Sequence, residues 1–262
     1  MKGLSDLSPK KAPRNRLDAA LVARGLAETR AKAQGLILSG RVLLDGAVVT
    51  RCGAPVRTDQ AVSLSPAPRP FASRGGMKLD GALDDFGISC VGKTALDVGA
   101  STGGFTDCLL RRGAARVYAV DVGEKLIDDR LRKDPRVVVL EKVNFRYATA
   151  ELLPEKVELA TVDVSFISLR HILPPVRVFL KPSAVVLALV KPQFEAGRAS
   201  VGKGGVVRDE ARRQEAVRAV ADIAAGLGFS VMGKSESRVK GPSGNREVFL
   251  HLEWKGAAEG AE

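Results

Sequence analysis

The sequence has few cysteines, few histidines and no long apolar run, and each shortage excludes a class of protein. Its three cysteines, Cys52, Cys90 and Cys108, show no Cys-x-x-Cys spacing, and only two histidines accompany them. Neither a disulfide framework nor a zinc site is supported, so we expect no metal and a reducing compartment. The longest apolar run, 184–190, is too short to cross a bilayer, and the N-terminus is unlike a signal peptide. These features predict a soluble, cytoplasmic protein that does not insert into membranes.

Acidic residues are scarce relative to basic ones, and the deficit is uneven. The 262 residues contain 41 lysines and arginines against 30 aspartates and glutamates, which gives a net charge of +11. Residues 1–70 carry +7 of this excess, with 12 basic side chains against 5 acidic ones, while the rest of the chain is nearly balanced at +4. A basic excess points to a polyanion such as RNA, DNA or an acidic surface, and charge alone does not choose among them.

Proline spacing divides the chain into two unlike parts. Within residues 65–73, three prolines in five positions favour an extended linker. Before the linker, the pattern predicts two short helices and a hairpin that turns at Asp45-Gly46, which together form a small α+β domain. After it, strand and helix patterns alternate, as is typical of an α/β domain with a parallel sheet and covering helices. The expected divisions are an N-terminal extension (1–13), the small domain (14–64), the linker (65–73), the α/β domain (74–254) and a tail (255–262).

The α/β domain is expected to hold seven strands in one sheet. The strands are predicted at 94–98, 116–122, 137–141, 159–166, 184–190, 229–235 and 247–254. The helices are predicted at 75–86, 104–112, 124–132, 168–179 and 208–226. A glycine-rich segment, 196–205, is long enough to act as a lid or to contact a substrate.

The segment LDVGASTGGFTD, residues 96–107, lies on a turn from a strand to a helix. Gly99 and Gly103 let the backbone turn tightly and approach a ligand, and the N-terminus of the helix offers free N–H groups. Asp121 ends the next strand, where a carboxylate can accept hydrogen bonds from ribose hydroxyls. The combination indicates an adenosine cofactor, and the spacing departs from the G-x-G-x-x-G typical of NAD and FAD sites. A glycine-rich turn also occurs in α/β proteins that bind no cofactor.

Four polar residues that are far apart in the sequence are expected at one edge of this sheet. Asp163 ends a central strand and Lys191 follows the next, and the carboxyl ends of parallel strands meet at one edge. Glu247 begins the last strand, which would run antiparallel after a hairpin through 240–245, and Lys78 lies near the start of the first helix of the domain. Each residue taken alone has a simpler interpretation as a solvated charge or a turn carboxylate.

These motifs resemble those of known methyltransferases. The pattern D-x-G-x-x-x-G resembles motif I of the class I S-adenosylmethionine-dependent methyltransferases, which implies S-adenosylmethionine as the cofactor and a Rossmann-like sheet. The implied cofactor-binding residues are Asp97, Gly99, Ala100, Ser101, Thr102, Gly103, Asp121, Asn144 and Asp163. Asn144 would lie near the adenine edge, although it could instead cap a helix.

The Lys-Asp-Lys-Glu set resembles the catalytic tetrad of the FtsJ-like RNA ribose 2′-O-methyltransferases. The resemblance implies that Lys191 removes a proton from a ribose hydroxyl, because a desolvated lysine beside another cation can accept a proton near neutrality. Asp163 would orient Lys191, while Lys78 and Glu247 would position the hydroxyl for in-line attack.

Other methyl acceptors leave signatures that this sequence lacks. Amino-directed enzymes usually place Asn/Asp-Pro-Pro-aromatic after the fourth strand, whereas this chain has Asp163-Val164-Ser165-Phe166. Enzymes that methylate a base carbon need a cysteine nucleophile in the same region, and the three cysteines lie elsewhere. Ribose oxygen is the acceptor that remains best matched.

The small domain resembles the alpha-L RNA-binding module of ribosomal protein S4 type. The resemblance rests on RLDAALVARGL (16–26), TRAKAQGLILSGRV (29–42) and LDGAVV (44–49). With almost no aromatic residues, this domain cannot rely on base stacking, so basic side chains are expected to contact phosphates, unless they form a merely solvated basic face. The expected phosphate contacts are Arg14, Arg16, Arg30, Lys32 and Arg41.

Taken together, the two parts closely resemble the TlyA, or hemolysin A-like, family over residues 14–254. The resemblance adds SRGGMKL (73–79), VKPQFE (190–195) and GNREVFL (244–250) to the motifs above. It implies a cytidine 2′-O-methyltransferase that acts on 23S rRNA and, in some members, also on 16S rRNA, with ribosomal RNA or ribosomal subunits rather than DNA as partners. The alternatives are a membrane-active hemolysin and an RNA-binding ribosome assembly factor with a vestigial cofactor site.

Overall fold

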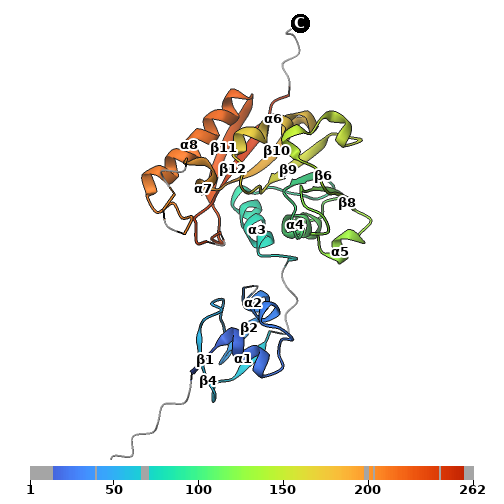
Figure 1. Ribbon diagram of the computed structural model, residues 1–262. Helices are drawn as coiled ribbons and strands as arrows, with labels where there is room; N and C mark the ends of the chain where they lie inside the picture. The colour runs from blue at the N-terminus through green and yellow to red at the C-terminus, as the bar shows by residue number, and fades with distance from the viewer. Residues whose placement is uncertain are drawn as a thin grey trace, which may run out of the picture. The chain divides into compact units, whose positions relative to one another are not determined.

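The computed structural model describes residues 14–38, 40–65, 71–197, 201–202, 204–241 and 243–256 (Figure 1). Contacts between Cα atoms divide the chain into two compact units, Met1–Pro70 and Phe71–Glu262. Among the described residues, none of the helices combines the length and apolar character that a bilayer-spanning segment requires. Several expected segments lie outside the described residues: the extension 1–13, positions 66–70 of the linker, positions 198–200 and 203 of the glycine-rich segment, and positions 257–262 of the tail.

The first unit consists of two short helices and small antiparallel sheets. Its elements are β1 (Arg14–Arg16), α1 (Leu17–Ala23), α2 (Arg30–Leu38), β2 (Val42–Leu44), β3 (Ala47–Val48), β4 (Pro55–Arg57) and β5 (Val62–Leu64). Leu21 of α1 and Ala33 and Ile37 of α2 are fully buried, because apolar residues at helical spacing share one face. The expected hairpin joins β2 to β3, and Asp45 and Gly46 take the positive φ angles, 50° and 81°, of a tight turn.

The second unit is built on one seven-stranded sheet, as the alternating pattern predicted. Its strands are β6 (Thr94–Val98), β7 (Arg116–Val120), β8 (Val137–Leu140), β9 (Val157–Val162), β10 (Leu180–Val190), β11 (Phe229–Glu236) and β12 (Val248–Trp254). Their order across the sheet is β11-β12-β10-β9-β6-β7-β8. The strands from β10 to β8 are parallel, whereas β12 runs antiparallel between β10 and β11. The antiparallel last strand expected from the hairpin is therefore confirmed.

Helices cover both faces of this sheet. They are α3 (Gly75–Phe86), α4 (Gly104–Arg111), α5 (Asp129–Arg132), α6 (Leu173–Val176), α7 (Pro192–Glu195) and α8 (Glu210–Gly226), with 3₁₀ turns η1 (Phe145–Tyr147), η2 (Ala150–Leu152), η3 (Leu169–His171) and η4 (Arg177–Phe179). Side chains of α3 and α4 form one core with Ala95 and Val117 of the sheet, and those of α6 and α8 form a second core with Leu96 and Val98. Because the central strands are buried on both faces, they are nearly continuous apolar runs.

Several expected boundaries differ from the structure. The segment 124–132 contains only the short helix α5, and 168–179 is divided into η3, α6 and η4, because Pro174 and Pro175 remove backbone donors from a continuous helix. The strand expected over 159–166 ends at Val162, so Asp163 lies in the loop beyond it. Phe71, which was expected in the linker, is buried in the core of the second unit, where it packs against Gly76.

Candidate functional site

The carboxyl ends of the central strands carry three of the four polar residues that the sequence placed at one edge. The last residue of β10 pairs with the first residue of β12, so Lys191 and Glu247 lie at the same edge. Asp163 comes directly after β9, the parallel neighbour of β10 on its other side. Lys78, in the first turn of α3, reaches the same edge through Glu247. The structure brings the four residues together as two lysine–carboxylate ion pairs.

The first pair joins Lys78 and Glu247 in the interior of the second unit. Lys78 Nζ donates to Glu247 Oε2 at 2.6 Å, and the two residues are 6% and 1% exposed. The other carboxylate oxygen, Oε1, is buried and accepts no hydrogen bond from the described residues. Gly241 lies so close to this oxygen that a Cβ atom would overlap it. A buried oxygen without a donor is unusual in folded proteins and is typical of a site completed by a ligand or a water molecule.

The second pair joins Lys191 and Asp163 across the loops that follow β10 and β9. Lys191 Nζ lies 2.6 Å from Asp163 Oδ1 and donates a hydrogen bond to Ser165 Oγ at 2.9 Å. The contact with Asp163 lacks the angular geometry of a hydrogen bond, so Oδ1 keeps its acceptor capacity. Lys191 is only 8% exposed. Its amine is therefore fixed in a largely dry position, which suits a group that exchanges a proton with a neighbouring hydroxyl.

The turn between β6 and α4 has a backbone conformation that requires glycine at two positions. Gly99 has a φ of 86°, and a Cβ atom there would lie 2.6 Å from the carbonyl oxygen of Asp163. Gly103 has a φ of 90°, and its Cβ atom would overlap a leucine of α5. These glycines are thus required by their positive φ angles as well as by close packing. The remaining residues of the turn are Ala100, which is buried, and Ser101 and Thr102, which are exposed.

Asp121 comes directly after β7 and holds the tip of this turn. Its Oδ2 accepts the N–H of Ser101 at 2.8 Å, and its Oδ1 accepts the N–H of Gly123 at 2.8 Å. Each carboxylate oxygen has a second acceptor position, which leaves capacity for ribose hydroxyls. Asn144 caps a helical turn, since its side chain accepts the N–H of Arg146 at 3.2 Å at the start of η1. Its place beside an adenine stays a prediction.

Asp97 lies beneath the turn rather than in contact with solvent. Its Oδ2 accepts the Thr106 hydroxyl at 2.7 Å and its Oδ1 accepts the Thr161 hydroxyl at 3.0 Å. Burial raises the pKa of Asp97 to about 7, and the two threonine hydroxyls only partly oppose this effect. The side chain is fully buried and presents no surface to a ligand. We infer that Asp97 fixes the turn against α4 and β9 and does not itself contact a cofactor.

The raised pKa of Asp97 predicts that the protein loses stability as the pH rises from about 4 to about 7. The pKa is higher in the folded chain than in the unfolded one, so this residue favours folding below about pH 4, and that contribution is lost as pH rises to about 7. Asp97→Asn stays neutral and can hydrogen bond to both threonines. We therefore expect it to abolish the pH-dependent loss in the free energy of unfolding, which is on the order of 2–4 kcal/mol. Denaturant unfolding at about pH 4.5 and 7.5, on either side of most of this window, measures the loss. Equal losses in both proteins would contradict the prediction.

In the first unit, two of the expected RNA-contacting arginines surround a buried carboxylate. Asp18 accepts from Arg16 Nη2 at 3.0 Å, Arg30 Nε at 3.1 Å and Gln34 Nε2 at 3.1 Å. These bonds, led by the one from Arg16, hold the pKa of Asp18 well below its usual range. The side chains of Arg16 and Arg30 are still 55% and 58% exposed. Asp18 therefore presents two guanidinium groups to solvent in a fixed arrangement.

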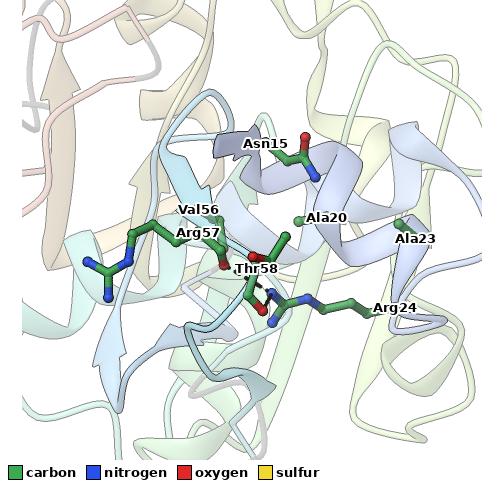
Figure 2. A pocket seen from close by; sticks show the side chains of 7 residues that line it. All are labelled: Asn15, Ala20, Ala23, Arg24, Val56, Arg57 and Thr58. Carbon is green, nitrogen blue, oxygen red and sulfur yellow. Dashed lines mark hydrogen bonds between the residues drawn. The ribbon is translucent and has the colours of Figure 1, made fainter. Parts of the chain in front are cut away.

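The other side chains of this unit that were expected to contact RNA do not share a buried partner of this kind. Lys32 pairs with Glu28 one helical turn away, Arg41 donates to the carbonyl of Ser65 at 3.5 Å, and the side chain of Arg14 lies outside the described part of the structure. The same unit has a hollow of about 200 Å³ (Figure 2). Arg24 donates there to backbone carbonyls of the 57–60 turn, so it holds the turn. The hollow is lined by Asn15, Ala20, Ala23, Arg24, Val56, Arg57 and Thr58.

Comparison with protein families accounts for both units. Residues 71–254 match the FtsJ-like methyltransferase family, and residues 15–62 match the S4 domain. The first match covers more than half of the chain. The chain belongs to the FtsJ-like methyltransferase family.

Individual relatives of this FtsJ-like methyltransferase extend over nearly its whole length. It is 47% identical to the 16S/23S rRNA (cytidine-2′-O)-methyltransferase TlyA of Mycobacterium tuberculosis over 242 residues. This match covers 92% of this chain and 90% of the relative. It is 39% identical to Hemolysin A of Brachyspira hyodysenteriae over 90% of this chain and 99% of the relative. A solved structure of a provisionally named hemolysin from Streptococcus thermophilus is 40% identical, with a TM-score of 0.73 over 93% of this chain and 89% of that one. The expected membership of the TlyA family is confirmed.

The edge of the FtsJ-like sheet suits S-adenosylmethionine, the methyl donor expected from motif I and from membership of the FtsJ-like methyltransferase family. The turn 99–103 places exposed backbone at the N-terminus of α4, where a carboxylate is favourably bound. Asp121 provides acceptors for ribose hydroxyls at the end of the neighbouring strand. This set of donors and acceptors fits a nucleoside that carries a charged amino acid.

Several residues of the FtsJ-like site were not found from the sequence. Thr161 pairs directly with Asp97 in the register of β9 and β6, so two polar residues at matched positions of buried strands were a usable signal. Ser165, the hydrogen-bond partner of Lys191, had no such signal, because it is one of several polar residues in a loop. Asp18 was inside the RLD motif but, as an acidic residue, was not expected at a phosphate-binding surface.

Proposed function

We propose that this chain transfers the methyl group of S-adenosylmethionine to the ribose 2′-hydroxyl of a cytidine in ribosomal RNA. The observation that carries the proposal is the presence of two lysine–carboxylate pairs, the buried pair of Lys78 with Glu247 and the partly buried pair of Lys191 with Asp163, at the edge that holds the glycine turn. The name of the Mycobacterium tuberculosis relative supports the cytidine and the rRNA. On the same basis we propose that the protein works in the cytoplasm, on 23S rRNA and possible 16S sites within ribosomal subunits.

The proposed roles follow from what each side chain can do. S-adenosylmethionine, when bound, supplies a methyl group on a positively charged sulfur that departs as a neutral thioether. After its ammonium group has released a proton to solvent, the neutral Lys191 amine accepts the proton of the 2′-hydroxyl as the ribose oxygen forms its bond to the methyl carbon. Asp163 then stabilises the resulting ammonium group, 2.6 Å away, and Ser165 fixes its direction. Lys78 and Glu247 hold the ribose for in-line attack, and Glu247 Oε1 still lacks a donor among the described residues.

Mapping of ribose methylation tests the proposal directly. Purified protein is incubated with S-adenosylmethionine and with 30S subunits, 50S subunits or naked rRNA, and 2′-O-methylated nucleotides are then located by primer extension. We expect one or a few cytidines to be modified. If the protein binds the cofactor but modifies none of these substrates, the proposal fails. Direct lysis of red cells by the same preparation, undiminished by Lys191→Ala, would favour a hemolysin, and RNA binding without cofactor binding would favour an assembly factor.

The first unit is proposed to bind RNA through the arginines held by Asp18. We expect Arg16→Gln combined with Arg30→Gln to weaken rRNA binding and to lower the slope of log affinity against log salt by about 2, because two phosphate contacts are lost. Glutamine can still donate to Asp18, so folding is retained. Filter binding at several salt concentrations measures the slope. Arg57→Gln is the matched control, since Arg57 pairs with exposed Asp59 in the same unit. An unchanged slope in the double variant would contradict the assignment.

A further inference from the structure

We propose that Glu195 is a positioning residue that holds the loops of Asp163 and Lys191 in register with one another. The inference rests on the proposed function only where it is tested by the rate of methyl transfer. Glu195 ends α7, the single helical turn that follows Lys191, and lies outside the four residues assigned to the reaction. Both of its carboxylate oxygens are bound to the other loop. Ser168 Oγ donates to Oε2 at 2.6 Å, and the N–H of Leu169 donates to Oε1 at 2.9 Å.

The two loops contact each other at three points that follow one another along the chain. At the first point, the Lys191 amine contacts the Asp163 carboxylate and donates to a serine hydroxyl. At the second, the rings of Phe166 and Phe194 meet with centroids 5.2 Å apart. Glu195 makes the third set of contacts. These are two hydrogen bonds to a charged acceptor, which are stronger than bonds between neutral groups.

The loop after β9 needs this restraint because its backbone is strained. Phe166 has a φ of 64°, in the left-handed region that non-glycine residues rarely adopt, and the residue is 92% exposed. Burial therefore contributes little to holding this conformation, and a strained residue persists only where its surroundings fix it. Leu169, whose N–H binds Glu195, is 1% exposed and anchored in the core beneath the loop. Glu195 thus connects the helical turn after Lys191 to the fixed end of the Asp163 loop.

A purely structural role would have a different signature from a positioning role. If Glu195 only capped η3, its loss would lower stability and leave the rate of the bound complex unchanged. If it aligns Asp163 with Lys191, its loss lowers kcat while the affinity for cofactor and RNA is kept, because misplacement of a reacting group by about 1 Å can slow a reaction about 100-fold. The two roles are therefore separated by comparing kcat with KM and with the Kd of S-adenosylmethionine.

The experiment compares Glu195→Ala and Glu195→Gln with the unaltered full chain. We expect Glu195→Ala to reduce kcat about 10- to 100-fold, with KM for rRNA and Kd for S-adenosylmethionine changed less than about threefold. Glu195→Gln should recover most of the rate, because its carbonyl oxygen can accept from Leu169 and its amide can donate to Ser168. Glu158→Ala is the matched control: Glu158 also holds a backbone N–H, of Thr94 at 2.9 Å, but at the opposite end of β9. It should keep its kcat.

Hydrogen–deuterium exchange supplies a readout that does not need activity. In Glu195→Ala, amides of 163–169 should exchange at least about tenfold faster, while those of the turn 99–103 should be unchanged. Unchanged exchange at 163–169, or a kcat in Glu195→Ala equal to that of the unaltered chain, would overturn the inference. An unaltered chain that methylates no rRNA would instead refute the proposed function, and the exchange result would still decide whether Glu195 restrains the loop.

Discussion

The Lys191→Ala variant is expected to bind S-adenosylmethionine normally and to transfer methyl groups about a thousandfold more slowly. The reason is that Lys191 provides the only amine in contact with Asp163 and Ser165 among the described residues, so no other group can take the proton of a hydroxyl placed there. A positioned base contributes about 10²–10⁴-fold to a rate, which sets the size of the loss. Single-turnover transfer of labelled methyl groups to rRNA measures the rate, and calorimetry measures cofactor affinity.

The chain provides a matched control for this variant. Lys181 stands near the opposite end of β10 and pairs with Glu158 at 2.8 Å, so Lys181→Ala also removes a strand-flanking lysine from an ion pair. It should transfer methyl groups at the normal rate. If Lys191→Ala kept more than about a tenth of its activity while Lys181→Ala was normal, Lys191 would not be the base, and the chemical step would depend on orientation alone.

The second large effect is expected on stability, at the buried pair of Lys78 and Glu247. Replacing Lys78 with methionine leaves a charged carboxylate 1% exposed and without its partner. Removing one member of a buried ion pair typically costs about 3–5 kcal/mol, whereas replacing both members with apolar residues is often neutral. We therefore expect Lys78→Met to lose about 3–5 kcal/mol in denaturant unfolding. The double variant Lys78→Met, Glu247→Leu should recover most of that loss.

The double variant also separates folding from catalysis. If the pair positions the ribose hydroxyl, the stable double variant should still be inactive on rRNA, because neither replacement side chain can form a hydrogen bond to the hydroxyl. A loss below about 1 kcal/mol in Lys78→Met would show that the remaining carboxylate finds solvent or another donor. Activity in the double variant would remove both residues from the proposed mechanism while leaving the roles of Asp163 and Lys191 intact.

The sequence was informative wherever a repeated pattern or a fixed geometric rule applied. Lys191 and Asp163 could be assigned to one edge because parallel strands end together, and Glu247 joined them because the loop before it predicted a hairpin. Helix bounds were accurate for α3, where the apolar pattern is regular and Gly87 ends it with a φ of 64°. The division of 168–179 was not predicted, although Pro174-Pro175 inside the expected helix was a usable signal for it.

What could not be predicted depends on contacts between loops and on burial. Nothing in the local pattern shows that Glu195 reaches across to Ser168, because the two residues are 27 positions apart and on irregular segments. Asp97 could be recognised as a motif residue but not as a fully buried one, since its burial depends on how α4 packs over the turn. The same holds for Asp18, which was not singled out in the sequence and whose contacts with two arginines depend on the fold of the first unit.

The position of β12 in the sheet has a consequence for the way the chain is made. Domains form as they leave the ribosome, N-terminal segments first. Lys78 emerges early, but Glu247 stands at the start of the last strand, 169 residues later. Until that strand inserts between β10 and β11, the lysine has no carboxylate and β10 has an open edge. On the proposed mechanism, a chain that still lacks this strand has an incomplete site, so methyl transfer requires that Glu247 and β12 have already been added.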